Sequence, residues 1–257
     1  MKISIITTTF NSGKTIRDTM ESVLKQTYQD YEYIIKDGAS TDDTLEIIRQ
    51  YEPRFKGKLK VISTPDKGIY DGMNKGIAVA TGDVVGILNS DDFYTTDDIL
   101  QSVYTVLNQS PDLDAVYGDL HYVNRRDLNK CVRYFTSRYF RPCLLRCGFM
   151  PGHQSFYCRR TVHERYGLYN LKYQTSSDFD MMVRLFAKHK IKTKYINKDF
   201  VTMRLGGMST AGLRSKIKVN KDVAASLKDH GIYSNQLLQG VRYLWRIGEV
   251  LYARIWF

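Results

Sequence analysis

The chain has 257 residues, of which 43% are hydrophobic and 25% are charged, a composition typical of globular proteins with one substantial core. It contains no run of about 18 apolar residues and no signal-peptide cleavage site, which argues against a membrane-spanning helix and against secretion. The formal net charge of +11 favours partners that carry phosphate groups, but no nucleic-acid-binding motif is present, so nucleic acid is not an expected partner.

Basic residues are concentrated in residues 184–221, which contain eleven Lys or Arg and the single acid Asp199. Such a stretch either attracts phosphate groups or is an ordinary solvated surface. The four cysteines form no C-x-x-C pair, so we expect free thiols in a reducing, cytoplasmic compartment. The alternative is a zinc site, with a ligand spacing that matches no standard pattern, formed by Cys143, Cys147, His153 and Cys158.

The first 110 residues alternate between short apolar runs and segments whose apolar residues recur at helical spacing. Strands and helices that alternate with short connectors indicate an α/β fold, in which helices flank a mostly parallel central sheet. The second helix is expected to begin at Ser40 or Thr41, which are good N-cap residues. The predicted strands are 2–10, 31–38, 59–64 and 83–90, and the predicted helices are 12–26, 40–51, 69–80 and 96–109.

Beyond residue 113 the pattern is less regular. Residues 124–150 give no clear assignment, and the glycine-containing residues 204–212 are expected to form a loop. A helix is predicted over 176–190, with Ser177 or Asp178 as its N-cap. The remaining predicted elements are strands at 114–123 and 153–160 and a helix at 161–167.

Polar and acidic residues follow each of the first four predicted strands. Ligands of parallel sheets bind at the carboxyl ends of the strands, so these residues are candidates for a binding site. The set contains hydroxyl groups, an aromatic ring and four aspartates, which is more acidic than an ordinary collection of loops. Its members are Thr7 to Asn11, Asp37, Asp66, Asp91 and Asp92.

The adjacent aspartates Asp91 and Asp92 repel each other unless something neutralises them. Paired carboxylates at a strand end suit Mg²⁺ or Mn²⁺, which keep coordination positions open for substrate phosphates. The alternative is that one of the two aspartates begins a helical turn. The sequence contains no G-x-G-x-x-G, Walker A or G-x-S-x-G motif, which argues against dinucleotide, P-loop and α/β-hydrolase chemistry.

Two segments, "SIITTTFNSGKTIRDTMESVLKQTYQDYEYIIKDGASTDDT" and "DKGIYDGMNKGIAVATGDVVGILNSDDFY", resemble family 2 inverting glycosyltransferases of the GT-A fold. The later "PGHQSFYCRR", "SSDFDMMVRL" and "LGGMST" follow in the family's order, so the resemblance covers about residues 1–210. It points to the bacterial capsule or exopolysaccharide branch, of the colanic-acid type. The resemblance implies a GT-A domain at 1–213, with a nucleotide-binding half at about 1–113 and an acceptor and catalytic half at about 114–213.

The same resemblance implies roles for single residues. Asp178 would be the catalytic aspartate, with a plain N-cap as the alternative, and His153 would touch the acceptor or donor unless it is a structural histidine. Asp91 and Asp92 would bind the metal, although Asn89 replaces the first acid of the family's motif. The donor nucleotide would contact Thr8, Phe10, Asp37, Asn74 and Asp91. A loop closing over the diphosphate would contain Arg204, Gly206, Gly207 and Ser209.

The implied reaction transfers a sugar from a nucleotide-diphosphate sugar, expected to be UDP-linked, to a hydroxyl of a saccharide or polyprenyl-linked saccharide in surface polysaccharide biosynthesis. Such a transfer needs positive charge at the leaving diphosphate and a base at the acceptor hydroxyl, which Mn²⁺ or Mg²⁺ and Asp178 would supply. Two alternatives stay open. One is a non-catalytic nucleotide-sugar or polysaccharide-binding module on the same fold, and the other is a nucleotidyltransferase, which would release pyrophosphate.

Residues 214–257 are predicted to form a separate helical segment. An amphipathic helix rich in Trp, Leu and Arg can lie in a membrane interface, so we expect contact with an anionic membrane at the inner face of the cytoplasmic membrane. The alternative is a helix that packs on the domain or on a second copy of the chain. The apolar stripe of this helix consists of Val241, Leu244, Trp245, Gly248, Leu251, Tyr252 and Ile255.

Overall fold

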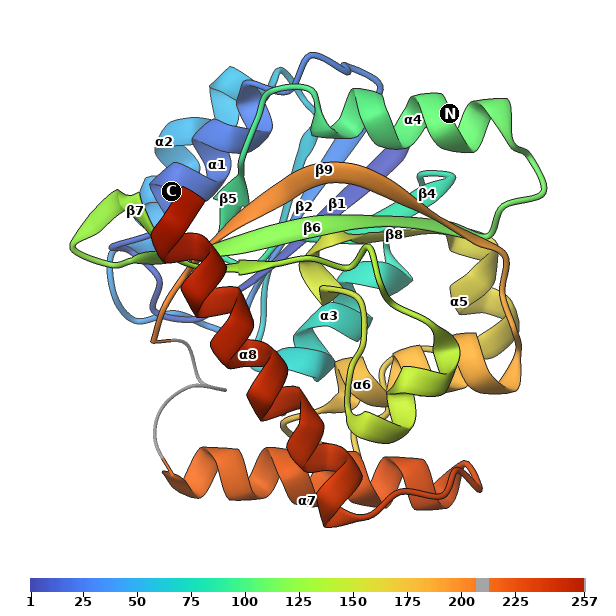
Figure 1. Ribbon diagram of the computed structural model, residues 1–257. Helices are drawn as coiled ribbons and strands as arrows, with labels where there is room; N and C mark the ends of the chain where they lie inside the picture. Colours follow the sequence, from blue (N-terminus) through green and yellow to red (C-terminus); the bar gives the residue numbers. More distant parts are fainter. Residues whose placement is uncertain (207–212, 257) are drawn as a thin grey trace.

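The computed structural model describes residues 1–206 and 213–256, which form a nine-stranded sheet with helices on both faces (Figure 1). The strand order is β3-β2-β1-β4-β8-β6-β9-β5, and β7 pairs with β6. The strands are β1 (Ile3–Thr9), β2 (Tyr31–Asp37), β3 (Leu59–Ser63), β4 (Val84–Ile87), β5 (Phe93–Tyr94), β6 (Ala115–Asn124), β7 (Asp127–Phe135), β8 (Phe156–Arg159) and β9 (Thr193–Arg204).

The sheet is mostly parallel, as the sequence predicts. The pairs β1–β2, β1–β4, β2–β3 and β6–β9 are parallel. Strand β8 is antiparallel to both β4 and β6, and it thereby joins the amino-terminal half of the sheet to the second half. Strands β5, β7 and β9 were not predicted, and they add the far edge of the sheet.

Two clusters of buried hydrophobic side chains lie on the two faces of the sheet. Successive residues of a strand point to opposite faces, so Ile5 and Ile6 of β1 belong to different clusters. Helices α1, α2 and α4 cover one face, and α3, α5, α6 and α7 cover the other (Figure 1). The helices are α1 (Ile16–Leu24), α2 (Thr44–Tyr51), α3 (Ile69–Ala78), α4 (Ile99–Gln109), α5 (Arg160–Tyr166), α6 (Ser177–Met182), α7 (Leu213–Asp229) and α8 (Gln236–Trp256).

Shorter helical segments complete the chain. The helix predicted over 176–190 is α6 followed by the π-helical segment η4 (Val183–Lys188). The 3₁₀ helices are η1 (Glu52–Phe55), η2 (Pro142–Cys147) and η3 (His153–Ser155).

The two predicted N-caps are wrong. Helix α2 begins at Thr44 with Asp43 as its N-cap residue, because Ser40 instead donates its hydroxyl to the Asp37 carboxylate. Helix α6 has Ser176 as its N-cap, so Ser177 and Asp178 lie inside the first turn. In the first case a local side-chain contact with the last residue of β2 takes the residue that propensity favours as a cap.

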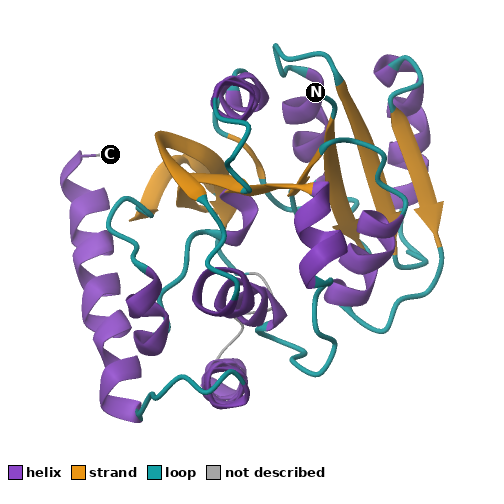
Figure 2. Ribbon diagram, turned by 90° about the vertical axis from the view of Figure 1, so that its right-hand side faces the viewer, coloured by secondary structure: helices purple, strands orange, loops and turns teal. Residues whose placement is uncertain are grey.

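The carboxy-terminal helices lie against the second half of the sheet. Helix α8 packs on β7 and η2, and it runs along the outer side of the molecule (Figure 2). The basic residues of 184–221 are distributed over η4, β9 and α7 rather than gathered on one element. Among the described residues, every helix is too short or too polar to cross a lipid bilayer.

Candidate active site

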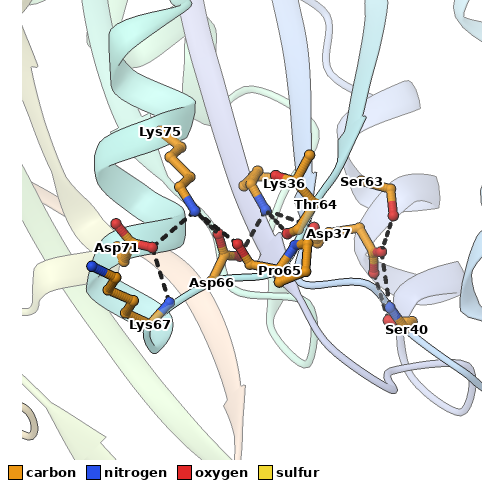
Figure 3. A network of polar contacts seen from close by, with 10 residues as sticks. All are labelled: Lys36, Asp37, Ser40, Ser63, Thr64, Pro65, Asp66, Lys67, Asp71 and Lys75. Carbon is orange, nitrogen blue, oxygen red and sulfur yellow. Dashed lines mark hydrogen bonds and ion pairs between the residues drawn. The ribbon is translucent and has the colours of Figure 1, made fainter.

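The carboxyl ends of β1 and β2 form one wall of the site. The hydroxyl oxygen of Thr8 is buried without a hydrogen-bond partner in the described part of the chain, whereas the ring of Phe10 is 62% exposed. Asp37 is fully buried, and its carboxylate accepts hydrogen bonds from the Ser40 amide at 3.0 Å and the Ser63 hydroxyl at 2.7 Å (Figure 3). These serines hold the carboxylate beside an exposed aromatic ring.

A network of lysines and acids supports this wall (Figure 3). The fully buried ammonium group of Lys36 donates to the carbonyl oxygens of Asp37 and Thr64, each at 2.6 Å, and to the Asp66 carboxylate at 2.7 Å. Asp66 also accepts from Lys75 at 2.8 Å. The position of Asp66 at a strand end was predicted from the sequence, but the buried Lys36 that fixes it was not.

Two glycines allow Thr8, Phe10 and Asp66 to come together. A Cβ atom at Gly38 would lie 3.4 Å from the Phe10 ring and 3.5 Å from the Asp66 carboxylate. A Cβ atom at Gly72 would lie 3.0 Å from that carboxylate and 3.1 Å from the Thr8 methyl group. The glycines thus let an aromatic ring and a carboxylate lie close together, a combination that suits a flat, hydrogen-bonding ring as ligand.

The two adjacent aspartates follow β4 and have different surroundings. The side chain of Asp91 is 31% exposed and lies 3.9 Å from the guanidinium group of Arg125. Asp92 is only 1% exposed, and one of its oxygens accepts from the Asn89 amide at 3.2 Å. Burial raises the pKa of Asp91, and burial together with the charge of Asp91 raises the pKa of Asp92 well above its usual range. A nearby positive charge would therefore stabilise the ionised form of both carboxylates.

This loop provides oxygen ligands that fit a hard divalent cation. The second oxygen of Asp92 and the amide oxygen of Asn89 are buried without a hydrogen-bond partner among the described residues. Within the described chain, no group of three or more His, Cys, Asp or Glu side chains is arranged to hold a metal ion. The zinc site considered for Cys143, Cys147, His153 and Cys158 is therefore not formed. A cation would therefore be held by one or two carboxylates and would complete its coordination with substrate phosphates and water, as Mg²⁺ commonly does.

Arg204 lies at the end of β9 and holds the aspartate loop. It donates to the Asp91 carbonyl oxygen at 2.6 Å, forms an ion pair with Asp18, and stacks over the Phe93 ring at 5.0 Å. Gly206 follows with a φ of +97°, a conformation that favours glycine, and Arg125 donates to its carbonyl oxygen. The predicted loop residues Gly207 and Ser209 lie outside the described residues.

Asp178 lies in the first turn of α6 and contacts helix α3. Its carboxylate accepts a hydrogen bond from the Tyr70 hydroxyl at 2.9 Å and from the Phe179 amide at 2.8 Å. Tyr70 stacks on Tyr169 with ring centroids 5.6 Å apart. Neither tyrosine was predicted, although Tyr70 lies within the quoted "GIYDGMNKG" segment.

His153 and Asn74 both contact Tyr169. His153 is buried, and its Nε2 atom lies 2.5 Å from the Tyr169 hydroxyl. Burial lowers the pKa of His153, which keeps the ring neutral at pH 7. The Asn74 side chain bonds the backbone of Tyr169 in both directions, each at 2.9 Å. These contacts fix the Tyr169 ring between Tyr70, on which it stacks, and His153.

A cavity of about 250 Å³ opens beside Asp178 and His153. Its walls come from β6, β7, the turn at residues 148–154, α7 and α8. Of the predicted site residues in the described chain, only Asp178 and His153 line it, while Thr8, Phe10, Asp37, Asn74 and Asp91 do not. The structure thus separates the nucleotide wall from a second pocket, and α8 contributes to that pocket in a way that the sequence did not predict.

Comparisons with known proteins give a consistent result. The chain is 31% identical to a PGL/p-HBAD biosynthesis glycosyltransferase of Mycobacterium bovis over 194 residues, which are 76% of this chain and 73% of that protein. It superimposes on S. aureus TarS 1–349 in complex with UDP, with a TM-score of 0.65 and 18% identity, covering 88% of this chain and 65% of that one.

A second solved structure is similar over nearly the whole chain. The mannosyltransferase PcManGT from Pyrobaculum calidifontis, in complex with GDP-Man and Mn²⁺, gives a TM-score of 0.63 at 15% identity and covers 98% of this chain and 86% of that one. The fold is therefore the GT-A fold. Residues 4–166, well over half of the chain, match the family described as Glycosyl transferase family 2. The chain belongs to this family and is a glycosyltransferase.

Proposed function

We propose that the protein transfers a sugar from a nucleotide-diphosphate sugar to an acceptor hydroxyl with inversion at the anomeric carbon. The observation that carries the proposal is the position of Asp178, a carboxylate that is held by Tyr70 and lines a cavity to which Thr8, Phe10 and Asp37 do not contribute. Donor and acceptor can approach this carboxylate from different sides, as a direct displacement requires.

In this reaction Asp178 accepts the proton of the acceptor hydroxyl. The acceptor oxygen forms a bond to the anomeric carbon, the bond to the diphosphate breaks, and its electron pair leaves with the nucleoside diphosphate. The hydrogen bond from Tyr70 keeps one carboxylate oxygen in place and leaves the other for the acceptor. His153 is neutral and hydrogen-bonded to Tyr169, so its role is to hold the Tyr169 side chain in place and not to exchange a proton.

The donor nucleotide is assigned to the wall formed by Thr8, Phe10 and Asp37, with the base on the exposed Phe10 ring and a hydrogen bond to Asp37. We expect a UDP-linked sugar. The TarS structure contains UDP and the PcManGT structure contains GDP-Man, which supports a nucleotide-sugar donor. Because the two nucleobases differ, a panel of nucleotide sugars has to identify the base of the donor.

Asp91 is the proposed main metal ligand, because it is the more exposed of the two aspartates. Asn89 fixes Asp92 by a hydrogen bond, and the unpartnered oxygens of these two residues are the further oxygen atoms available in the loop. When bound, Mn²⁺ or Mg²⁺ would neutralise the leaving diphosphate. Arg125 adds a positive charge next to Asp91, and Arg204 fixes the backbone of the loop. The Mn²⁺ in the PcManGT structure supports the assignment of a divalent cation.

The stereochemistry of the product tests the single-displacement mechanism. An α-linked donor is expected to give a β-linked product, because one attack opposite the leaving group inverts the anomeric carbon. Proton NMR of the first product formed, read from the anomeric coupling constant, checks this. A product that keeps the α configuration would rule out Asp178 as the base of a direct displacement.

We also propose that the enzyme works at the inner face of the cytoplasmic membrane, in surface polysaccharide biosynthesis, and binds the membrane through α8. The orientation of this helix supports the proposal, because Arg242 and Glu249 are buried against the domain while Leu244, Leu251 and Ile255 of the apolar stripe are more than half exposed. Trp245 and Tyr252 lie at the edge of the stripe and pack on Tyr139, Phe149 and Tyr134. Arg138 lines a cavity together with α8, and Arg146 lies over the ring of Tyr233 just before the helix, so both can complement anionic lipids. The large hydrophobic side chains of α8 that are between 45% and 85% exposed are Leu237, Val241, Leu244, Ile247, Leu251, Tyr252 and Ile255.

A double change of Ile247 and Leu251 to glutamate tests membrane binding. Each buried side chain contributes about 1.5–3 kcal/mol, so we expect binding to phosphatidylglycerol vesicles to fall by at least about tenfold in co-sedimentation. Val61→Glu, at an exposed site on β3, is the control and should bind as the wild type does. If the double variant sediments with vesicles as well as the wild type, α8 does not anchor the protein.

A further inference from the structure

Helix α3 contacts the two halves of the site with two different faces. A Cβ atom at Gly72 would meet Thr8 and one at Gly76 would meet Ile6, so this face of the helix lies on β1 and the nucleotide wall. Asn74 is two residues away from each glycine, which corresponds to a rotation of about 200° around the helix axis. The Asn74 side chain therefore leaves the helix on the side away from Thr8, although the family resemblance implies a contact with the donor nucleotide.

The amide group of Asn74 is bound by the backbone of Tyr169, which lies between α5 and α6. Nδ2 of Asn74 donates to the Tyr169 carbonyl oxygen at 2.9 Å, and Oδ1 accepts from the Tyr169 amide at 2.9 Å. One planar group thus bonds both polar backbone groups of a single residue. This pair of hydrogen bonds fixes the position of Tyr169 relative to α3 as well as its orientation.

The ring of Tyr169 is also held at its hydroxyl end. The residue is 5% exposed, and its hydroxyl oxygen lies 2.5 Å from Nε2 of His153. Burial raises the pKa of Tyr169 well above its usual range and lowers the pKa of His153, so the hydroxyl donates and the neutral imidazole accepts. Because the ring is anchored at both ends, it is a fixed surface for a neighbouring side chain.

Tyr70 packs on this surface. It precedes Asn74 by one turn of α3, on the same face, and its ring stacks on Tyr169 with centroids 5.6 Å apart and an angle of 30° between the planes. Its hydroxyl donates to the Asp178 carboxylate at 2.9 Å. Burial and the charge of Asp178 raise the pKa of Tyr70 well above its usual range, which keeps this hydroxyl protonated as a donor.

From these contacts we propose that Asn74 is a positioning residue for the glycosyl transfer and not a ligand of the donor. It holds the Tyr169 backbone, the Tyr169 ring holds the ring of Tyr70, and the Tyr70 hydroxyl holds the carboxylate of Asp178. The assignment rests on the proposed function, because it explains how the base of that reaction is oriented. It also makes α3 the element that joins the nucleotide wall to the base.

Asn74→Ala distinguishes positioning from donor binding. We expect kcat to fall by about 10- to 100-fold, because a small displacement of a catalytic group is enough for an effect of this size. Isothermal titration with the nucleoside diphosphate that the wild type releases, expected to be UDP, should give an unchanged affinity. Asn170→Ala is the matched control, because Asn170 is exposed, follows Tyr169 directly and bonds the Lys172 amide at 3.1 Å. It should change neither kcat nor the affinity.

The Asn74→Ala variant is expected to fold. Alanine favours helix over asparagine, so α3 loses nothing in local propensity. Arg184 still donates to the Leu168 carbonyl oxygen at 2.6 Å, directly before Tyr169, and keeps the connection between α5 and α6 in place. Thermal melting of the variant checks this before the kinetic measurements.

A double-mutant cycle with Tyr70→Phe separates positioning from a general effect on stability. Phenylalanine keeps the stacked ring and removes the hydroxyl, so kcat should fall by about 10- to 100-fold, as expected for a lost hydrogen bond to a charged group. Adding Asn74→Ala to Tyr70→Phe should lower kcat little further, because Asn74 acts through Tyr70. Losses that multiply in the double variant would contradict the proposal.

Hydrogen exchange of the Tyr169 amide, followed by NMR, tests the anchor without turnover. Exchange should be at least about tenfold faster in Asn74→Ala than in the wild type, because this amide loses its acceptor. Unchanged exchange, an unchanged kcat, or an affinity for the nucleoside diphosphate that falls by about tenfold or more would overturn the role of Asn74. Full turnover by Asp178→Asn would instead overturn the proposed base, so the two failures are distinguishable.

Discussion

Replacing Asp178 by asparagine is expected to lower turnover by about 10²- to 10⁴-fold, the usual contribution of a positioned general base, while the affinity for nucleotide stays unchanged. The amide has nearly the same shape and can still accept the hydrogen bond from Tyr70, but it cannot take the acceptor proton. Steady-state kinetics with a saturating donor measure the first effect, and titration with the nucleoside diphosphate measures the second.

Asp180→Asn is the matched control in the same turn of α6. Asp180 is buried and accepts from Ser226 at 2.9 Å and from His230 at 3.0 Å, so its change should lower the melting temperature and leave the turnover of the folded protein largely intact. The account would be wrong if Asp178→Asn kept wild-type turnover, or if it abolished nucleotide binding.

The second large effect is expected at the proposed metal ligand. Asp91→Asn should raise the Mn²⁺ concentration required for half-maximal activity by about 10- to 100-fold, as the loss of groups that hold a metal commonly does. Titration of activity with Mn²⁺ measures this change. Asp97→Asn, at an exposed acid beyond β5, should have no effect.

Asp92→Asn separates the roles of the two aspartates. Asp92 is buried against Asn89, so we expect its change to affect the stability of the loop more than the Mn²⁺ requirement. A Mn²⁺ requirement that rises with Asp92→Asn and not with Asp91→Asn would reverse the assignment.

The amino-terminal half of the fold could be predicted from the sequence because each element carries its own pattern. The apolar runs of β1 and β4 are buried at every position, and α1 and α4 show apolar residues at helical spacing. Strand β9 has no such pattern. Its residues 193–204 mix charged and apolar side chains, and its pairing with β6 and β5 depends on segments far away in the chain.

The candidate site was predictable only where it follows from strand ends. Asp37, Asp66 and Asp91 lie at the edge where a parallel sheet places them. The contact of Tyr70 with Asp178 joins residues 108 positions apart, and the bond between Asn74 and Tyr169 spans 95 positions. Local sequence patterns do not reveal pairs so far apart, so Tyr70, which bonds Asp178, and Tyr169, which stacks on Tyr70, were not predicted.

Helix α8 illustrates a different limit. Periodicity predicts the helix and its apolar stripe, and both are confirmed. A stripe on one face normally marks the buried side, yet here Arg242 and Glu249 are buried against the domain and most of the apolar stripe, including Leu244 and Ile255, is exposed. The sequence of a single helix does not show which of its faces packs on the rest of the protein. Here the packing partners determine the buried face, because Arg133 of β7 pairs with Glu249 and Gly148 lies next to Arg242.

The most direct test of the central claim is a panel of nucleotide sugars incubated with the full chain and Mn²⁺, with the released products identified by chromatography. The account predicts that one nucleotide sugar, which we expect to be UDP-linked, is turned over with release of the nucleoside diphosphate, and that Asp178→Asn binds the same compound without turnover. Release of inorganic pyrophosphate would indicate a nucleotidyltransferase. Binding of nucleotide sugars without turnover under any condition, or no binding at all, would contradict the assignment of the site.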